Sequence, residues 1–451
     1  MTLEEKDPSE MSYFCGQLYH HLMDFLRELE WRHMLQDATP GVEEYLASGP
    51  CVGYIGFDPT APSLTIGNYV QLMLLTLFQR AGHTPIVLMG GATGRIGDPS
   101  GKDKERELKS FEELDRNLAH QENQMRKLIA FEGVPNPARL VNNHDFYRDM
   151  NVLEFLRTAG KTLTVNYMMA KESVKKRVET GISFTEFSYQ ILQAYDFQCL
   201  YEQQHCKLQM GGSDQWGNIT SGTEFIRRNL GGKAYALTTP LLTKADGSKF
   251  GKSEEGNIWL DPEMTSPYAF YQFWINADDR DIPKFMRYFT LRSKEEVLQL
   301  EQDHATDPNT LKRLLAEEIT SRVHSSEALS NAQNVSKLLF NPRVDSDFLH
   351  GMSQAEWKMV AREIPAYTLP YTLLDGQEIP IIDLLAEHTT ILQSKGEARR
   401  AISGNAISVN KVKITSPEEG IRKDQLIQDT YLLLENGKKN KFLITFSSQS
   451  I

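Results

Sequence analysis

Two short apolar runs, each followed by a loop of small residues, constrain the fold of this chain most strongly. Residues 51–57 form the first run, which ends at the loop 58–62 and is followed by a Leu- and Met-rich stretch at 67–77. The second run, at 85–89, leads directly into the glycine-rich loop 90–98. Strand, loop, helix, strand and loop in this order are typical of a parallel α/β sheet, in which ligands bind at the carboxyl ends of the strands. The sequence therefore predicts an α/β fold, a Rossmann-like parallel sheet with a ligand site beside these loops.

The rest of the chain divides by pattern into further segments. Residues 1–50 are predicted to be helical, because an apolar stripe recurs at three- and four-residue steps. The stripe consists of Leu18, Leu22, Phe25, Leu26 and Leu29. Two more strand candidates, 138–141 and 207–210, extend the α/β domain, to which we assign 51–265. The remaining segments are a helical domain at 266–360, a Pro-containing linker at 361–380 and a small α+β domain at 381–451.

Composition argues against several classes of protein. No run approaches the about eighteen apolar residues of a membrane span, and the N-terminus is acidic where a secretory signal would be basic, so we expect a cytoplasmic protein. The four cysteines form no CxxC pair, which predicts neither a zinc site nor a disulfide framework. A net charge of −11 argues against unspecific coating of nucleic acid. Residues 394–451, however, carry ten Lys and Arg against six Asp and Glu, which suits a selective RNA contact.

Three loops contain residues that could hold a nucleotide. In 58–68, small residues would let a nucleotide approach the start of a helix, although an ordinary βα loop has the same pattern. In 90–106, basic residues would hold polyphosphate or form a solvated charged surface. In 244–253, the lysine loop, Lys249 and Lys252 flank a glycine and suit the neutralisation of a departing pyrophosphate. This loop is not a P-loop, because Asp246 stands where that motif needs its first glycine.

Six segments resemble, in family order, the signature segments of the bacterial tyrosyl-tRNA synthetases, which are class I aminoacyl-tRNA synthetases. They are residues 54–68, 90–102, 165–173, 188–197, 209–218 and, inside the lysine loop, 249–253, which is similar to the KMSKS signature. The resemblance implies a ligase that activates L-tyrosine with ATP to tyrosyl-adenylate and pyrophosphate, then transfers tyrosine to the 3′ end of tRNA(Tyr). It also implies that 51–265 is the catalytic domain and 266–360 the anticodon-side domain.

The resemblance implies a pocket for tyrosine. Tyr54 and Asp196 would receive the phenol hydroxyl, one as donor and one as acceptor, and would reject phenylalanine because an unpaired buried polar group is costly. The other pocket residues would be Asp98, Tyr189 and Gln193 at the amino group and Gln215 at the carboxyl end. Tyr189 and Gln193 stand four apart and share one face of a helix, which without the other motifs would indicate a partly buried polar side.

The resemblance also implies an ATP site and groups that stabilise pyrophosphate. The ATP-binding residues would be Gly56, Asp58, Gly67, Asn68, Gly212, Asp214 and Lys252. The catalytic residues would be Thr60, Thr65, Lys102, Arg106, Lys249, Lys252 and Ser253. Asn143 and Gln209 match the family less specifically and could instead order their loops. Mg²⁺ is expected on the ATP phosphates, and no metal is expected in a protein cage.

One segment departs from the family. The class I signature His-Ile-Gly-His is replaced at 65–68 by Thr-Ile-Gly-Asn, and neither Thr nor Asn can carry a positive charge. We expect Thr60, Thr65 and the lysines to compensate.

The basic tail resembles the small RNA-binding domain shared with a ribosomal small-subunit protein. Arg399 and Arg400 would lie on a helix, with Lys411 and Lys413 near a strand, and together would bind the phosphates of tRNA. A solvated basic surface is the alternative. The resemblance further implies a symmetric homodimer, and neither a membrane nor DNA is expected as a partner.

Three rival functions share part of this pattern. The sister enzyme for tryptophan has the same fold, but an indole offers no phenolic partner to Tyr54 and Asp196. A non-catalytic RNA-binding protein would explain the missing signature histidines, and the intact lysine loop argues against it. A nucleotidyltransferase for a soluble metabolite would leave the basic tail without a purpose.

Overall fold

The computed structural model describes residues 24–100, 108–253, 256–376 and 378–448. Lys102 and Arg106, two of the predicted catalytic residues, lie outside the described residues. The chain forms two compact units. The first contains the described residues up to Met264 together with Asn276–Leu315, and the second contains Thr265–Ile275 together with the residues from Ala316 onward.

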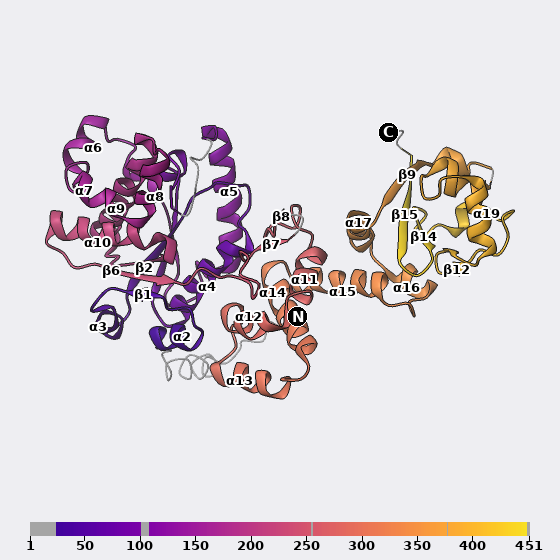
Figure 1. The fold of residues 1–451 in the computed structure, drawn as a ribbon, viewed down its shortest axis with the longest axis horizontal. Helices are drawn as coiled ribbons and strands as arrows, with labels where there is room; N and C mark the ends of the chain where they lie inside the picture. The colour runs from indigo at the N-terminus through magenta and orange to yellow at the C-terminus, as the bar shows by residue number, and fades with distance from the viewer. Residues whose placement is uncertain (1–23, 101–107, 254–255, 377, 449–451) are drawn as a thin grey trace, which may run out of the picture. The chain divides into compact units, whose positions relative to one another are not determined.

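A six-stranded sheet forms the centre of the first unit (Figure 1). In spatial order its strands are β1 (Asp37–Ala38), β6 (Tyr235–Thr239), β5 (Leu208–Gly212), β2 (Val52–Phe57), β3 (Thr84–Met89) and β4 (Arg139–Asn142). The five strands from β6 to β4 are parallel, and β1 pairs antiparallel with β6. The predicted α/β class with a parallel sheet is confirmed. Strands β3, β5 and β6 are buried almost along their whole length, as parallel strands covered on both faces are.

Long helices connect and cover these strands. They are α4 (Ile66–Arg80), α5 (Phe111–Leu128), α9 (Phe184–Gln204) and α10 (Trp216–Leu230). Helix α4 is buried on most of its surface, because its own Leu, Met and Phe side chains lie on nearly all of its sides. Helix α5 buries only one stripe, and the Ser110 side chain caps its N-terminus. The shorter helices of this unit are α2 (Phe25–Trp31), α3 (Val42–Ala47), α6 (Val152–Thr158), α7 (Val165–Met169), α8 (Glu172–Thr180), α12 (Ile282–Phe289) and α13 (Lys294–Asp303). The single turns are η1 (Thr93–Arg95), η2 (Asn143–Phe146), η3 (Ser213–Gln215) and η4 (Asp279–Asp281), and β7 (Lys252–Ser253) pairs with β8 (Gly256–Asn257).

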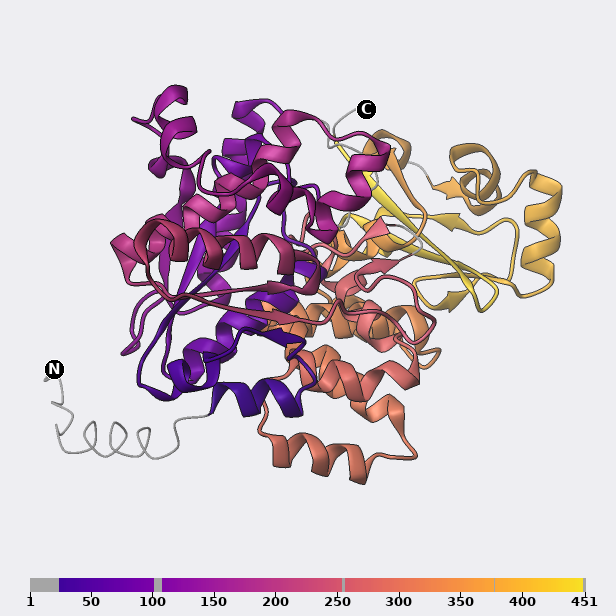
Figure 2. The same ribbon diagram turned by 60° about the vertical axis from the view of Figure 1, so that its left-hand side comes forward.

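The second unit combines helices with a small α+β domain. Its helices are α11 (Pro267–Ile275), the end of α14 (Pro308–Val323), α15 (Ser326–Phe340), α16 (Ser346–Gly351), α17 (Gln354–Glu363), α18 (Ile381–Asp383) and α19 (Lys395–Ser403), with the single turns η5 (Tyr371–Leu374), η6 (Leu384–His388) and η7 (Lys423–Gln425). A five-stranded sheet follows the order β12 (Val412–Lys413), β11 (Ile407–Val409), β14 (Tyr431–Asn436), β15 (Asn440–Ser447) and β9 (Ala366–Pro370). Strands β14 and β15 form a long hairpin at its centre (Figure 2). A separate pair joins β10 (Ile379–Pro380) and β13 (Gly420–Ile421).

Three predictions about segments differ from the structure. Of the helical segment expected at 1–50, residues 1–23, with Leu18 and Leu22, lie outside the described residues. The described part contains α2 and α3 and is interrupted at Asp37–Ala38 by an edge strand that pairs through its backbone and has no apolar alternation. The linker expected at 361–380 contains β9, whose Pro370 is tolerated because β9 is an edge strand. The helical segment 266–360 is divided between the two units, since α12 and α13 belong to the first. None of the described helices is long and apolar enough to cross a membrane.

Candidate functional site

A cavity of about 780 Å³ lies at the carboxyl ends of β2 and β5 and is called the site cavity below. These two strands are neighbours from which the chain continues toward opposite edges of the sheet, the position where parallel sheets bind ligands. Loops and helix starts complete the wall. The predicted residues that line it are Tyr54, Gly56, Asp58, Thr60, Thr65, Gly67, Asn68, Asp98, Asn143, Tyr189, Gln193, Asp196, Gln209, Gly212, Asp214, Gln215 and Lys249. Lys252 does not line the cavity, and the side chain of Ser253 lies outside the described part of the chain.

Tyr54 of β2 and Asp196 of α9 form the most buried part of the wall. They are 0% and 1% exposed. The Tyr54 hydroxyl is buried and has no hydrogen-bond partner among the described residues. Asp196 is held at both oxygens: the Tyr147 hydroxyl donates to Oδ1 at 2.6 Å and the Asn143 amide donates to Oδ2 at 2.8 Å. A buried hydroxyl without a partner beside a fixed carboxyl suits a ligand that brings a hydroxyl of its own.

Burial controls the protonation of this pair. Removal from water raises the pKa of the Asp196 carboxyl to about 7, while the hydrogen bonds from Tyr147 and Asn143 oppose that rise. Burial, followed by the charge of Asp196, raises the pKa of Tyr54 well above its ordinary value. Tyr54 therefore stays a protonated donor, and Asp196 titrates near neutral pH.

A chain of hydrogen bonds links Asp196 to Asp58, the carboxylate that follows β2. Asn143 also donates to the Thr93 hydroxyl at 2.9 Å, and Thr93 donates to Asp58 Oδ1 at 2.7 Å. The Tyr189 hydroxyl donates to Asp58 Oδ2 at 2.9 Å. Tyr189, expected beside the amino group of tyrosine, is thus bonded to a carboxylate that was assigned to the ATP side. Asn143 orders this wall through these bonds, as in the alternative that it orders its loop, and its role on the ATP side stays a prediction.

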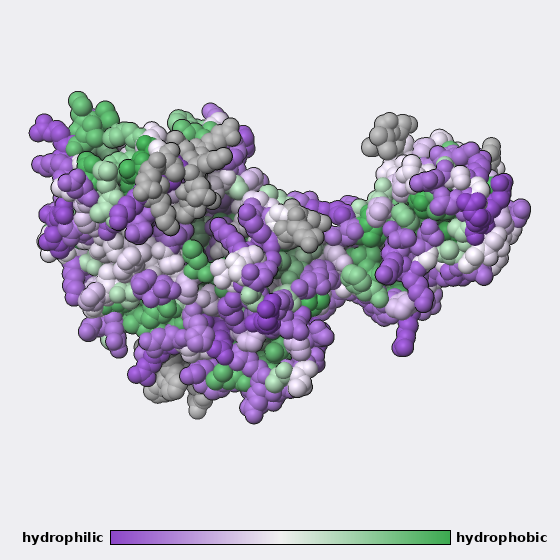
Figure 3. Space-filling model, viewed as in Figure 1, coloured by the Kyte–Doolittle hydropathy of each residue, from purple (hydrophilic) through white to green (hydrophobic). Residues whose placement is uncertain are grey.

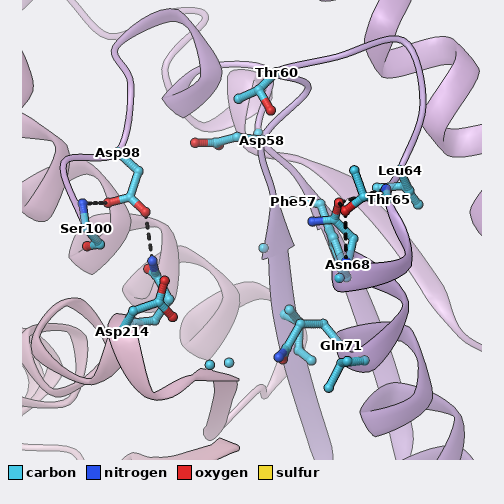
Figure 4. Close-up of a pocket in the computed structure, with 18 of the residues that line it drawn as sticks. Phe57, Asp58, Thr60, Leu64, Thr65, Asn68, Gln71, Asp98, Ser100 and Asp214 are labelled. Carbon is cyan, nitrogen blue, oxygen red and sulfur yellow. Dashed lines mark hydrogen bonds between the residues drawn. The ribbon is translucent and has the colours of Figure 1, made fainter. Parts of the chain in front are cut away.

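Asp98 faces the site cavity from the opposite side to α4, and Asp214 lies near it (Figure 4). The backbone N–H of Ser100 donates to Asp98 Oδ1 at 2.9 Å, and the Gln215 amide donates to Oδ2 at 2.7 Å. The Asn218 amide also donates to Oδ1, at 3.4 Å. All three donors are neutral, so the Asp98 charge can still attract a cation. Burial, followed by repulsion from Asp98, raises the pKa of Asp214.

Three glutamines that line the site cavity carry buried side-chain acceptors without a partner among the described residues. The Oε1 atoms of Gln71, Gln193 and Gln209 are buried and accept no hydrogen bond within the described ranges. Gln71 was missed by the sequence analysis, although it stands three residues after Asn68 on α4. The spacing of 65, 68 and 71 along one helix face would have indicated it. Its Nε2 donates to the Thr239 hydroxyl at 3.1 Å, which fixes the orientation of the amide.

Thr65 and Asn68, which replace the signature histidines, cap the N-terminus of α4 (Figure 4). The Asn68 N–H donates to Thr65 Oγ1 at 3.3 Å, and the Thr65 N–H donates to Asn68 Oδ1 at 2.9 Å. The Thr65 hydroxyl also lies 2.8 Å from Asn68 Oδ1 and donates to it. The polar groups of Thr65 are therefore engaged in a capping box. To stabilise phosphate as predicted, the Thr65 hydroxyl would have to give up its hydrogen bond to Asn68.

The lysine loop carries an exposed Lys249 into the wall of the site cavity. Lys252, in β7, is also exposed, and its carbonyl accepts from Lys244 Nζ at 2.8 Å. Phe250 between them is buried. The loop therefore presents charge at its surface and is anchored by an apolar side chain.

The basic residues of the small C-terminal domain differ in availability. Arg399 and Arg400 are exposed on α19. Lys413 donates to the carbonyl of Asn405 at 2.8 Å and remains exposed. Lys411 forms an ion pair with Glu435 at 2.7 Å, and its side chain is 10% exposed. Its charge is thus neutralised inside the domain, against the expectation that it takes part in an open basic patch.

Groups of three or more His, Cys, Asp or Glu side chains that could hold a metal ion are absent from the described residues. The carboxylates of the site cavity are engaged with hydroxyl, amide and backbone donors instead.

Comparisons with known proteins agree with this architecture. The family described as "tRNA synthetases class I (W and Y)" matches residues 47–341, and the "Tyrosine--tRNA ligase SYY-like C-terminal domain" matches residues 357–444. A tyrosine–tRNA ligase of Cytophaga hutchinsonii is 52% identical over 430 residues, covering 94% of this chain and 100% of that relative. One of Amoebophilus asiaticus is 50% identical with the same coverage. The solved C-terminally truncated mitochondrial tyrosyl-tRNA synthetase of Aspergillus nidulans matches with a TM-score of 0.64 and 27% identity, over 74% of this chain and 99% of that one.

Proposed function

Because this chain belongs to the class I tRNA synthetases and, within them, to the tyrosine–tRNA ligases, we propose that the site cavity binds the tyrosine and ATP that such a ligase joins. The protein activates L-tyrosine with ATP and transfers it to tRNA. The observation that carries the residue assignment is the buried Tyr54 hydroxyl, without a partner among the described residues, beside Asp196. A substrate phenol accepts from Tyr54 and donates to Asp196, so both buried groups are satisfied together. Phenylalanine would leave the Tyr54 hydroxyl without a partner, whereas Asp196 would keep only its bonds from Tyr147 and Asn143.

The amino group of tyrosine binds near Asp98. An ammonium group is attracted by this carboxylate, whose three described donors are neutral. Gln193 offers a buried acceptor on the same wall. Tyr189 acts through Asp58, which it holds in place. Gln215 lies between Asp98 and the carboxyl end of the substrate and is held by Asp98.

ATP binds along the first turn of α4 and the end of β5. Glycines let the nucleotide approach the backbone, and carboxylates suit the ribose hydroxyls. The residues proposed here are Gly56, Asp58, Gly67, Asn68, Gly212 and Asp214, to which the structure adds Gln71. The helix N-terminus supplies part of the positive potential that the signature histidines would provide. Mg²⁺ would be held by the phosphates of ATP and would offset their charge.

The reaction needs no nucleophile from the protein. A carboxylate oxygen of tyrosine attacks the α-phosphorus, the bond to the bridging oxygen breaks, and pyrophosphate leaves with that electron pair. Positioning and charge stabilisation are therefore the whole contribution of the chain. Lys249, Lys252 and Thr60 are proposed to stabilise the leaving group, and the same proposal extends to Ser253 and to Lys102 and Arg106.

The tRNA and the second subunit use other surfaces. Arg399, Arg400 and Lys413 are exposed and suit RNA phosphates, whereas Lys411 serves the domain through its ion pair.

For the homodimer we propose the apolar surface over α6 and α7, which Figure 3 shows at the upper left. Its exposed side chains on these two helices are Val152, Leu153, Leu156, Val165 and Met169. Exposed apolar patches of this kind mark interfaces. A Leu153→Glu change should yield monomers by sedimentation. The substrates are those of protein synthesis, for which we propose a cytoplasmic location.

Pyrophosphate exchange into ATP tests the assignment. The purified protein with Mg²⁺ is expected to exchange with tyrosine and not with phenylalanine or tryptophan. Tyr54→Phe should lower the preference for tyrosine over phenylalanine about tenfold, because it removes one hydrogen bond to the phenol. Tyr195→Phe is the matched control, since Tyr195 precedes Asp196 on α9 but does not line the site cavity. Exchange with tryptophan, or equal effects of the two changes, would sink the pocket assignment.

A further inference from the structure

One short helix holds both ends of the lysine loop. At the first end, the backbone N–H of Ala245 donates to Asp281 Oδ2 at 2.9 Å. Lys284 Nζ donates to the carbonyl of Thr243 at 2.5 Å and lies 3.0 Å from Asp281 Oδ1. Asp281 and Lys284 stand at and near the start of α12, so a carboxylate and an ammonium group bind two successive stretches of the loop backbone.

Asp281 binds the backbone of the loop rather than the backbone of its own helix. It occupies the N-cap position of α12, where an aspartate ordinarily accepts a hydrogen bond from an N–H of the first turn. Its side chain makes no such bond. The residue is 2% exposed, and its carboxylate is directed to Ala245 and Lys284 instead. A buried carboxylate that accepts from the loop backbone instead of capping its helix points to a role in the loop.

At the second end, Phe250 packs on the apolar face of the same helix. Its ring lies 5.3 Å from Phe289 in a stacked arrangement and 5.0 Å from Phe285. Phe289 in turn stacks on Tyr69 of α4 at 6.0 Å. Gly251 follows at φ +86°, and a Cβ there would come within 3.0 Å of Ile66 on α4. After Phe250 the loop therefore runs along the first turn of α4, which is part of the proposed ATP site.

Between these two ends the loop turns tightly. Gly247 adopts φ +81°, the Gly247 N–H donates to the Lys244 carbonyl at 2.9 Å, and the Ser248 N–H donates to Asp246 Oδ1 at 2.8 Å. Lys249 is the next residue and lines the site cavity. With both ends fixed and a short turn between them, the position of Lys249 depends on where α12 holds the backbone.

We propose that Asp281 and Lys284 form a clamp that positions the lysine loop for the activation step. Asp281 is the positioning residue and acts through Lys249; it does not touch the substrates. This inference rests on the proposed function of the loop. A group misplaced by about 1 Å can cost on the order of a hundredfold in rate, so a clamp on the backbone has a measurable effect. Tyrosine binding in the Tyr54–Asp196 pocket should not depend on it.

Single-turnover formation of tyrosyl-adenylate tests the clamp, with tyrosine affinity measured by equilibrium dialysis. Asp281→Ala should slow adenylate formation at least about tenfold while the tyrosine Kd stays within about twofold. Asp281→Asn should retain part of the rate, because its amide oxygen can still accept from Ala245. The matched control is Asp279→Ala, an exposed aspartate of the same turn that pairs with Lys312 and should keep the normal rate. Lys284→Met is a second clamp variant at a less buried position and should slow the step in the same direction.

A double-mutant cycle decides whether the clamp acts through Lys249. In a Lys249→Ala background, Asp281→Ala should cause no further loss, because the group it positions is gone. Independent, multiplicative losses would overturn the clamp, as would normal rates in Asp281→Ala and Lys284→Met beside an impaired Lys249→Ala. An unimpaired Lys249→Ala would instead overturn the proposed role of the lysine, and the clamp with it.

Discussion

The Tyr54–Asp196 pair and the lysine loop lie on one cavity but are built in opposite ways. Tyr54 and Asp196 come from a central strand and a long helix, are almost inaccessible to water, and Asp196 is fixed at both oxygens. Lys249 is exposed, and its loop is fixed through the backbone at Ala245 and through Phe250. In the proposed assignment, recognition of the substrate is therefore part of the protein core, whereas charge for the leaving group comes from a surface loop.

This difference has an energetic consequence. In the proposed assignment, a change at Asp196 alters the hydrogen bonding of the core and the binding of tyrosine together, because the same carboxylate oxygens serve both. A change at an exposed lysine alters the rate and leaves the core as it was. Each prediction below either separates the two regions by this criterion or shows that they are not separate.

The largest effect is expected at the loop. Lys249→Ala should slow adenylate formation by about a hundredfold to a thousandfold, because it removes a charged group that acts on the leaving pyrophosphate. The tyrosine Kd and the free energy of unfolding should stay unchanged within about 0.5 kcal/mol, since the side chain is exposed. Rapid-quench kinetics, tyrosine titration and urea unfolding measure the three quantities, with the exposed Lys294→Ala in α13 as control. A weakened tyrosine Kd would show that the loop also builds the tyrosine pocket.

The next effect is expected at the buried carboxyl. Asp196→Asn should lower kcat/KM for tyrosine by about tenfold to a hundredfold, because a hydrogen bond to a charged acceptor is lost and the new amide faces the donors Tyr147 and Asn143. The KM for ATP should stay unchanged. Steady-state exchange at varied tyrosine and varied ATP distinguishes the two. Equal losses for both substrates would mean that the change disturbs the whole cavity.

A smaller effect should follow pH. Burial raises the pKa of Asp196 to about 7, and the carboxylate form accepts the phenol hydrogen more strongly than the acid form. The tyrosine Kd should therefore rise about tenfold between about pH 8 and about pH 6, and Asp196→Asn should remove this dependence. Equilibrium dialysis across the range measures it. A pH dependence that survives in Asp196→Asn would assign the titration to another group.

The same ionisation acts on stability with the opposite sign. Since the folded-state pKa is raised above the unfolded value, the folded protein binds this proton more tightly between about pH 4 and about pH 7. The contribution to stability is present at low pH and is lost as the pH rises through 7. The free enzyme thus loses stability from Asp196 over the range in which it gains affinity for tyrosine. Urea unfolding of the wild type and Asp196→Asn at both ends of this range separates this contribution from other groups.

The sequence predicted the elements whose burial leaves a pattern in the residues. Strands β2 and β3 were found because both faces of a parallel strand are apolar, and the loops after them were found because ligand sites follow such strands. Edge strands β1 and β9 were missed, since two paired backbones require no particular side chains. The predicted roles of the site residues remain predictions, although most of them line one cavity.

Contacts between distant residues account for what the sequence could not give. Tyr147 and Asp196 are 49 positions apart, and no local pattern marks Tyr147 as a donor to a buried carboxyl. Glu435 neutralises Lys411 across 24 positions, so a basic pattern in the sequence became an ion pair in the fold. Asp281 was not singled out from the sequence, and its bond to Ala245 spans 36 positions. In each case the partner is set by the packing of elements rather than by spacing.

The smallest effect is expected at Thr65, which stands between the two regions. Its hydroxyl and backbone are engaged with Asn68 in the cap of α4, so Thr65→Ala should cost about 1 kcal/mol in the free energy of unfolding and slow adenylate formation by no more than about fivefold. Ser353→Ala is the matched control, because Ser353 forms the same capping box with Glu356 at α17, outside the cavity. It should match the loss of stability without any change in rate. A loss of about a hundredfold in Thr65→Ala at unchanged stability would mean that the hydroxyl leaves its cap to act on phosphate. The start of α4 would then belong with the lysine loop as a part of the machinery that acts in the transition state.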